Sequence, residues 1–287
     1  MRLVFVHGMR QEGQDPIALK GVWESALART WQKLGLSLSN SYELEMPFYG
    51  DVLDGLTNQL YVEESDIIAR GSAGPRTFSP LQESLLRGMS EKAGVLNQDV
   101  ERELGQEVVA RSPANWEWVQ ALARVLERKS PALGKFVLAF VVQVDAYLTR
   151  PHIKQAVDEI VAPTLNQGPT VIVAHSLGTI VSYTLLRGMT PSAQVPLFMT
   201  LGSPLGIEMV KSYLRPPSLA VPPGVMFWMN GADERDYVAL VSKLDATTFA
   251  AGILNDTAIY NRNEDAHSIE DYLSDLKIAQ RIYLALK

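Results

Sequence analysis

The sequence of 287 residues contains no cysteine. This excludes a disulfide framework, thiolate metal ligands and a cysteine nucleophile. Basic residues are also few, 26 against 32 acidic residues, so the formal net charge is -6. Such a chain lacks the excess positive charge that neutralises a phosphate backbone, and we expect no nucleic-acid partner. The four histidines are not spaced as helical metal ligands, and no glycine-rich loop ends in Lys-Ser/Thr, so we expect no metal and no other cofactor.

Long hydrophobic runs are absent as well. The most apolar run, residues 136–142, is followed by Gln143 and Asp145, far short of the roughly 18 to 20 residues that cross a bilayer. The opening MRLVFVHG is too short for the apolar core of a secretory signal. We therefore expect a cytoplasmic protein without a transmembrane segment, and nothing in the sequence argues for peripheral membrane contact. With 47% hydrophobic and 20% charged residues, the chain has the composition of a soluble globular protein.

Short apolar runs alternate with helical patterns at both ends of the chain. The runs that predict strands are residues 2–7, 42–48, 171–175, 196–202, 224–230 and 256–261. Apolar stripes with helical period lie between some of them, at 19–34, 150–166 and 269–286. This alternation predicts an α/β fold with an open, mostly parallel sheet flanked by helices.

The middle of the chain follows another pattern. Residues 51–149 show helical periodicity and no convincing strand. We therefore predict a helical, cap-like insertion within a single domain formed by residues 1–287, placed before the strand at 171–175. The apolar stretch 135–148 is predicted to be a buried helix of this insertion.

One stretch, VIVAHSLGTIVSY at 171–183, passes directly from a strand into a helix. Such a sharp turn holds the residue at its tip in a strained conformation, with the side chain above the sheet. The turn needs small residues two before and two after the tip, and here they are Ala174 and Gly178. The tip is then Ser176, which we predict to be a nucleophile.

A serine nucleophile requires a base, an acid that orients the base, and donors for the oxyanion. His267 follows the last predicted strand after a short polar loop and is the expected base. Asp233 and Asp236 both follow the preceding strand, and position in the sequence leaves either as the acid. The backbone N–H groups of Met9, after His7-Gly8, and of Leu177, after the serine, are the expected oxyanion donors.

These motifs, VFVHGM, VIVAHSLGTIVSY, MTLGSPLG, GADERDYV and NEDAH, together resemble those of the α/β-hydrolase superfamily. The resemblance is to its lipase and esterase branch, which includes lecithin-cholesterol acyltransferases and GPI-inositol deacylases, and it covers roughly residues 1–50 and 150–287. It implies Ser176 as nucleophile, His267 as base and Asp236, whose sequel Tyr-Val-Ala fits, as acid. Two departures are Ala174 where the family usually has glycine and an insertion placed before the nucleophile strand.

The resemblance and the residues together predict a serine hydrolase that cleaves a carboxylic ester, with a small-molecule or lipid-like substrate, through an acyl-enzyme. The same constellation serves thioesterases, amidases and acyltransferases, which the sequence does not separate. A non-catalytic binding protein on a hydrolase scaffold is the alternative from another class.

Overall fold

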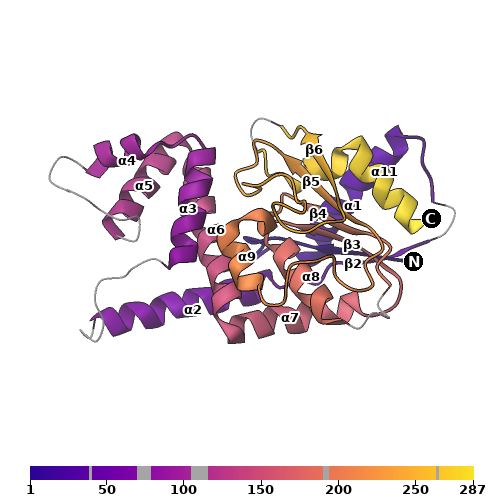
Figure 1. Cartoon of the computed structure of the whole chain (residues 1–287), viewed down its shortest axis with the longest axis horizontal. Coiled ribbons are helices and arrows are strands. Elements are labelled where there is room, and N and C mark those ends of the chain that lie inside the picture. Colours follow the sequence, from indigo (N-terminus) through magenta and orange to yellow (C-terminus); the bar gives the residue numbers. More distant parts are fainter. Residues whose placement is uncertain (39–40, 70–78, 105–115, 190–193, 263–264) are drawn as a thin grey trace. The chain divides into compact units, whose positions relative to one another are not determined.

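The computed structural model describes the chain except residues 39–40, 70–78, 105–115, 190–193 and 263–264 (Figure 1). The chain divides into two compact units. One consists of Met1–Asp51 and Gln155–Lys287, and we call it the sheet unit. The other, Val52–Lys154, is the helical unit.

The sheet unit is built on six parallel strands. They are β1 (Arg2–Val6), β2 (Glu43–Glu45), β3 (Thr170–His175), β4 (Phe198–Leu201), β5 (Trp228–Asp233) and β6 (Ile253–Ile259). They pair in the order β2-β1-β3-β4-β5-β6, and every described pair is parallel. β1, β3 and β4 are buried along their whole length, as expected of strands covered on both faces. The predicted α/β class with a parallel sheet is confirmed.

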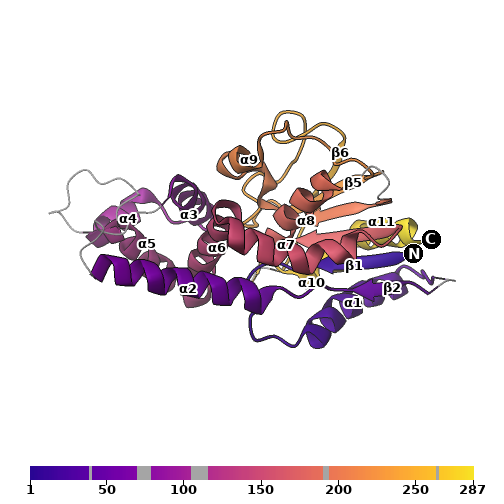
Figure 2. The ribbon, with the colours of Figure 1, turned by 90° about the horizontal axis from the view of Figure 1, so that it is seen from below.

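Helices cover both faces of this sheet (Figure 2). They are α1 (Pro16–Lys33), α7 (Pro151–Leu165), α8 (Leu177–Gly188), α9 (Glu208–Leu214), α10 (Ile269–Ser274) and α11 (Leu276–Leu286), with a 3-10 turn η1 (Pro204–Gly206). Because successive strand residues point to opposite faces, Leu3 and Phe5 pack with Trp23 of α1 in the core shared with α10 and α11. On the other face, Trp228 of β5 packs against Tyr183 of α8, with ring centroids 5.4 Å apart.

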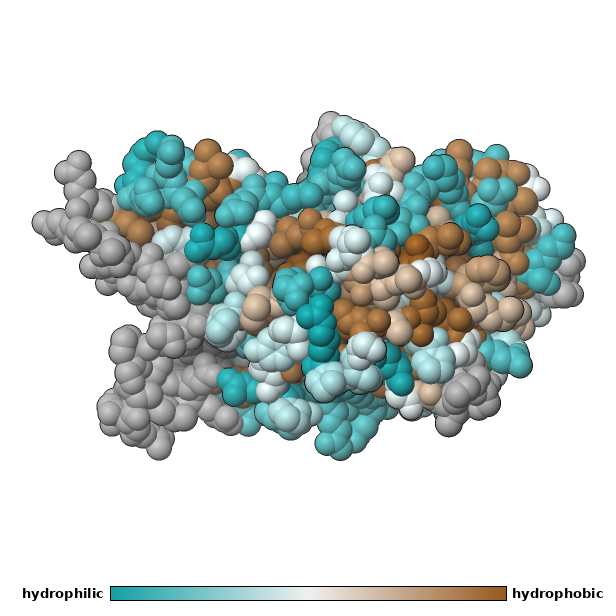
Figure 3. All heavy atoms as spheres, in the orientation of Figure 1, coloured by the Kyte–Doolittle hydropathy of each residue, from teal (hydrophilic) through white to brown (hydrophobic). Residues whose placement is uncertain are grey.

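Some predicted boundaries were wrong. Of the predicted strand 224–230, only residues 228–230 belong to β5, which runs from Trp228 to Asp233. Met226 and Phe227 precede the strand and are 67% and 60% exposed. On the face of the sheet unit seen in Figure 3, apolar residues (brown) are interspersed with hydrophilic ones (teal), so an apolar residue here need not be buried. β6 begins three residues earlier than predicted, at Ile253, and β2 is limited to three residues.

The C-terminal stripe also forms two helices rather than one. α10 ends at Ser274 and α11 begins at Leu276, with Asp275 between them. The side chain of Asp275 accepts hydrogen bonds from the N–H groups of Lys277 and Ile278 and so caps α11. This break fixes the length of α10, which carries a residue of the candidate site.

The described residues of the helical unit form helices and no strand. The helices are α2 (Gly50–Ala69), α3 (Pro80–Lys92), α4 (Asn97–Leu104), α5 (Trp116–Lys129) and α6 (Pro131–Thr149). Within the described chain, α6 contains one stretch, Ala132–Thr149, that is long and apolar enough to cross a membrane, and half of it is buried. Its Asp145 is buried and accepts hydrogen bonds from Ser79 Oγ (2.6 Å) and Gln82 Nε2 (3.1 Å). These contacts are those of a core helix, as the sequence predicted for 135–148.

Candidate functional site

The strand order locates a switch point between β1 and β3. From β1 the chain goes to β2 on one side, and it later returns to β3 on the other side. In open parallel sheets, ligands bind in the crevice at the carboxyl ends of the strands at such a point. His7 follows β1 directly and Ser176 follows β3 directly. The candidate site therefore lies at the carboxyl ends of these two strands.

Ser176 has a backbone conformation that is rare for a residue with a side chain. Its φ and ψ are 56° and -129°, between the end of β3 and the first turn of α8. Among the described non-glycine residues, only Arg10 shares a positive φ. Such a conformation costs on the order of 1 to 3 kcal/mol and persists only where the surroundings impose it. The hydroxyl is buried and no hydrogen bond to its Oγ is found.

Gly178 explains how the chain can turn so sharply at this serine. A Cβ at Gly178 would lie 2.4 Å from the carbonyl oxygens of both Val6 and His7. These are backbone atoms, which cannot move aside as a flexible side chain could. Only glycine therefore lets the start of α8 approach the end of β1, and this is the small residue that the sequence required two positions after Ser176.

His267 and Asp236 meet in the same unit. The Nδ1 of His267 lies 2.7 Å from Oδ2 of Asp236, and both side chains are buried. Because an ionised carboxylate only accepts, Nδ1 carries the proton in this hydrogen bond. Burial by itself would raise the pKa of Asp236, but the charge of His267 and the hydrogen bonds from His267, Val238 N–H and Tyr272 outweigh it and leave the pKa below its ordinary value. With the proton on Nδ1, a neutral imidazole at this position would have its lone pair on Nε2.

Asp233, the alternative acid, is engaged elsewhere. Its Oδ2 accepts from Arg235 Nη2 (2.7 Å) and from the Asn261 N–H (2.7 Å), and its Oδ1 accepts from the Arg235 N–H (2.8 Å). Burial would raise the pKa of Asp233, but these hydrogen bonds outweigh it and lower the pKa. Asp233 thus ties the end of β5 to the segment after β6, while Asp236 contacts His267.

The His267 ring lies against the residue that precedes Ser176. The ring centroids of His175 and His267 are 4.4 Å apart, and Nε2 of His175 lies 3.0 Å from the carbonyl oxygen of His267. A carbonyl only accepts, so Nε2 of His175 donates. Burial and the nearby His267 keep the pKa of His175 well below its ordinary value, although Asp236 and this hydrogen bond act in the opposite direction. A neutral His175 therefore fastens the loop that carries His267 to the end of β3.

Gly202, which follows β4, leaves room for this pair. Its φ is +54°, and a Cβ there would lie 2.7 Å from Asp236 Oδ2 and 2.9 Å from Nδ1 and Cε1 of His267. Gly202 belongs to the motif MTLGSPLG, which the sequence analysis noted without giving the glycine a role. The carboxyl ends of β1, β3, β4 and β5 thus all contribute backbone or side chains to the site.

The turn after β1 places the backbone of Gly8 against Ser176. A Cβ at Gly8 would lie 2.8 Å from Ser176 Cβ, so the Gly8 backbone touches the serine. His7 Nδ1 lies 2.7 Å from the Gly8 carbonyl oxygen, to which it donates. In a trans peptide the C=O and the following N–H point in opposite directions. The His7 ring therefore sets the peptide plane in which the Met9 N–H points away from His7.

Tyr49 holds His7 in the tautomer whose proton is on Nδ1, which the hydrogen bond to the Gly8 carbonyl requires. The Tyr49 N–H donates to His7 Nε2 (3.1 Å), the Tyr49 hydroxyl donates to the His7 carbonyl, and the two rings stack 4.1 Å apart. Burial lowers the pKa of His7 to about 4, although the bond to Gly8 acts in the opposite direction. The second expected donor, Leu177, is the first residue of α8, where a backbone N–H has no partner within the helix.

Of the five residues that the sequence singled out, Asp236 contacts His267, Leu177 follows Ser176 directly, and Met9 follows Gly8, which lies against Ser176. No hydrogen bond to Ser176 Oγ is found, so the pairing of Ser176 with His267 stays a prediction. Tyr49, Tyr272 and His175 also contact the predicted site residues or their neighbours. Tyr272 falls within the apolar stripe 269–286, whose period gives no sign of a polar contact. Tyr49 follows a predicted strand, and no pattern marked it.

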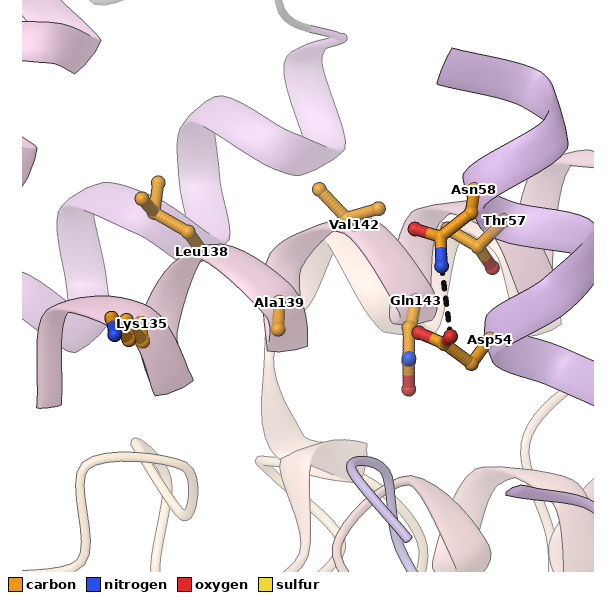
Figure 4. A pocket seen from close by; sticks show the side chains of 8 residues that line it. All are labelled: Asp54, Thr57, Asn58, Lys135, Leu138, Ala139, Val142 and Gln143. Carbon is orange, nitrogen blue, oxygen red and sulfur yellow. Dashed lines mark hydrogen bonds between the residues drawn. The ribbon is translucent and has the colours of Figure 1, made fainter. Parts of the chain in front are cut away.

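The helical unit has a pocket of its own, of about 370 Å³, between α2 and α6. Figure 4 shows the side chains that line it: Asp54, Thr57, Asn58, Lys135, Leu138, Ala139, Val142 and Gln143. Asn58 Nδ2 donates to Asp54 Oδ2 (2.8 Å), and the pocket lining contains no histidine or serine. The pocket lining therefore lacks the two residue types that the sequence predicts as nucleophile and base.

Comparison with known proteins adds nothing to this geometry: no protein-family model matches the sequence, and no curated protein matches it either. Among the described residues, no group of three or more His, Cys, Asp or Glu side chains is arranged to hold a metal ion. The expectation of a metal-free, cofactor-free site stays a prediction.

Proposed function

We propose that this chain is a serine hydrolase of the α/β-hydrolase type that cleaves a carboxylic ester through an acyl-enzyme. Ser176 is the nucleophile, His267 the general base and Asp236 the acid that orients it. The observation that carries the proposal is the buried His267–Asp236 pair, 2.7 Å apart, against the residue that precedes the strained Ser176. A lone serine in a turn would not need such a pair beside it.

In the first half of the reaction, Ser176 Oγ attacks the carbonyl carbon of the ester while His267 Nε2 takes the hydroxyl proton. The Met9 and Leu177 N–H groups donate to the oxygen that becomes negative, each contributing roughly 3 to 4 kcal/mol by analogy with other hydrolases. The carbon–oxygen bond to the alcohol then breaks, and His267 returns the proton to the leaving oxygen. The product of this half is an ester between the acyl group and Ser176.

In the second half, a water molecule takes the place of the alcohol. His267 Nε2 accepts a proton from the water as its oxygen attacks the acyl carbon, and the same two N–H groups stabilise the intermediate. The bond to Ser176 Oγ breaks, the proton goes back to Oγ, and the carboxylic acid leaves. Asp236 stabilises the imidazolium in both halves without taking its proton.

In this proposal, the helical unit Val52–Lys154 is an insertion of the hydrolase fold, located in the chain before the nucleophile strand. The proposed substrate is an ester with an acyl or lipid-like component. A p-nitrophenyl ester series of increasing acyl length, measured beside an acyl thioester and an anilide, ranks these bonds by kcat/KM. We expect the esters to be the best substrates, and a thioester or amide that exceeds them would replace ester cleavage as the proposed activity.

A fluorophosphonate probe tests the proposal most directly, because it reacts with an activated serine. We expect the wild-type protein to be labelled and Ser176→Ala to be unlabelled. Ser212→Ala removes an exposed serine whose Oγ bonds the Met209 carbonyl, and it serves as the matched control that should be labelled fully. A folded wild type that stays unlabelled would instead indicate a binding protein on this scaffold.

A further inference from the structure

A tyrosine hydroxyl bridges the two aspartates of the site. Tyr272 lies in α10 and is fully buried. Its hydroxyl donates to Asp236 Oδ2 (2.7 Å) and accepts from the backbone N–H of Asp233 (3.0 Å). The hydroxyl therefore uses both its proton and one lone pair in hydrogen bonds. Both partners, Asp236 and Asp233, lie in the segment 233–236 at the end of β5.

The contact completes the hydrogen bonding of a fully buried carboxylate. Asp236 is 0% exposed. Its Oδ1 accepts from the N–H groups of Val238 (2.8 Å) and Ala239 (3.3 Å), and its Oδ2 accepts from His267 and Tyr272. A buried carboxylate has about four acceptor positions, so Tyr272 supplies one of four donors. It is also the donor that shares an oxygen with the imidazole.

We propose that Tyr272 is a positioning residue of this site, which fixes the acid loop through one hydroxyl and limits the negative charge that Asp236 presents to His267. The proposal rests on the function proposed above. Two donors on one carboxylate oxygen compete for its electron density, so a stronger bond from Tyr272 weakens the attraction between Asp236 and a protonated His267. The tyrosine acts through the aspartate and does not contact the reacting atoms.

The protonation state of Tyr272 is suited to this role. Burial and the charge of Asp236 raise its pKa well above the ordinary value, although the bond from the Asp233 N–H acts in the opposite direction. The hydroxyl therefore stays a donor throughout the pH range in which a histidine base is active. Its position five residues after His267 also links the base loop and the acid loop through α10.

Two substitutions at this position should shift the pH profile in opposite directions. Tyr272→Phe removes the competing donor while keeping the ring, so the protonated His267 is stabilised, and the midpoint of the acid limb of kcat/KM moves up by about 0.5 to 1 pH unit. The plateau falls about tenfold, because the acid is held less firmly. Replacing Tyr272 by 3-fluorotyrosine strengthens the donor at almost constant size and moves the midpoint down by a few tenths of a unit.

Tyr283→Phe is the matched control. It removes a hydroxyl that donates to the Ser37 carbonyl (2.9 Å) from α11, and it should leave the profile unchanged. A role in packing alone would lower activity in step with thermal stability and leave the midpoint in place. The proposal is overturned if neither variant at position 272 moves the midpoint, or if both move it in the same direction.

An NMR titration of the His267 ring protons separates this proposal from the function on which it rests. The titration measures the midpoint of His267 protonation directly in the wild type and in both variants, and it requires no turnover. If the wild type hydrolyses nothing and takes no fluorophosphonate, the hydrolase proposal fails while the titration still judges Tyr272. If labelling and turnover are normal and the titration midpoints coincide, only the role of Tyr272 fails.

Discussion

The substitution Gly202→Ala should show whether activity depends on the geometry of the His267–Asp236 pair or only on the stability of the folded protein. In Gly202→Ala, the new Cβ would lie 2.7 Å from Asp236 Oδ2 and 2.9 Å from His267 Nδ1, where ordinary contact begins at 3.4 Å. The carboxylate or the imidazole must therefore move by several tenths of an ångström. Displacements approaching 1 Å at a reacting group cost on the order of 100-fold in rate. We expect kcat/KM for an ester to fall about 10- to 100-fold.

The same substitution also strains the backbone, because the φ of Gly202 is +54°. This value lies in the left-handed region, which alanine enters at a cost of about 1 to 2 kcal/mol. Gly252→Ala provides the control: its φ is +87°, a Cβ there would have its nearest contact at 3.5 Å, and it precedes β6 at the end of the sheet opposite to the site. It should lose stability to a similar extent and keep full activity.

The measurements are kcat/KM, fluorophosphonate labelling and the free energy of unfolding for both variants. The reasoning is refuted if Gly202→Ala keeps an activity within about threefold of Gly252→Ala, since the acid and base would then tolerate the displacement. It is also refuted if the loss of activity disappears when both proteins are assayed well below their unfolding temperatures, because strain alone would then explain it.

Three further predictions follow from the surroundings of the site. Asp236→Asn should lower kcat/KM by about 10⁴-fold, whereas Asp233→Asn should mainly lower the melting temperature, because Asp233 holds Arg235 and Asn261; activity and thermal unfolding of the two variants distinguish them. His7, whose pKa is lowered to about 4, binds a proton in the unfolded chain at higher pH than in the folded one, so stability should fall by about 3 kcal/mol as the pH drops from 6.5 to 4. Denaturant unfolding should show this slope and His7→Gln should reduce it by about one proton; an equal slope in both proteins would contradict the neutral state of His7. Ser176→Ala removes a buried hydroxyl for which no partner is found, so the free energy of unfolding should rise by about 1 kcal/mol, and a decrease would argue against an unsatisfied group there.

Much of the fold could be predicted because its signals are local. A strand buried on both faces is largely apolar, and residues 3–6 of β1 and 171–174 of β3 are all apolar. The prediction failed at β5, where the apolar Met226 and Phe227 are exposed while the polar Asn230 is buried. Asn230 is satisfied there by the Ser242 carbonyl (2.8 Å) and Asn255 Oδ1 (3.1 Å). Such long-range partners leave no periodic trace in the sequence, so apolarity misplaced the strand.

The sequence by itself determined the strand-to-helix turn at Ser176, because the close approach of two backbones demands a glycine at position 178 and little else. It also determined the alternation of buried strands and helices that brings the carboxyl ends of the strands together. The family resemblance favoured Asp236 over Asp233, but only the tertiary structure shows that Asp236 contacts His267, since the two aspartates lie three residues apart and differ in their distant partners. Tyr272 and Tyr49 could be recognised only there, because a hydrogen bond across more than 30 residues depends on distances in space that sequence spacing does not encode.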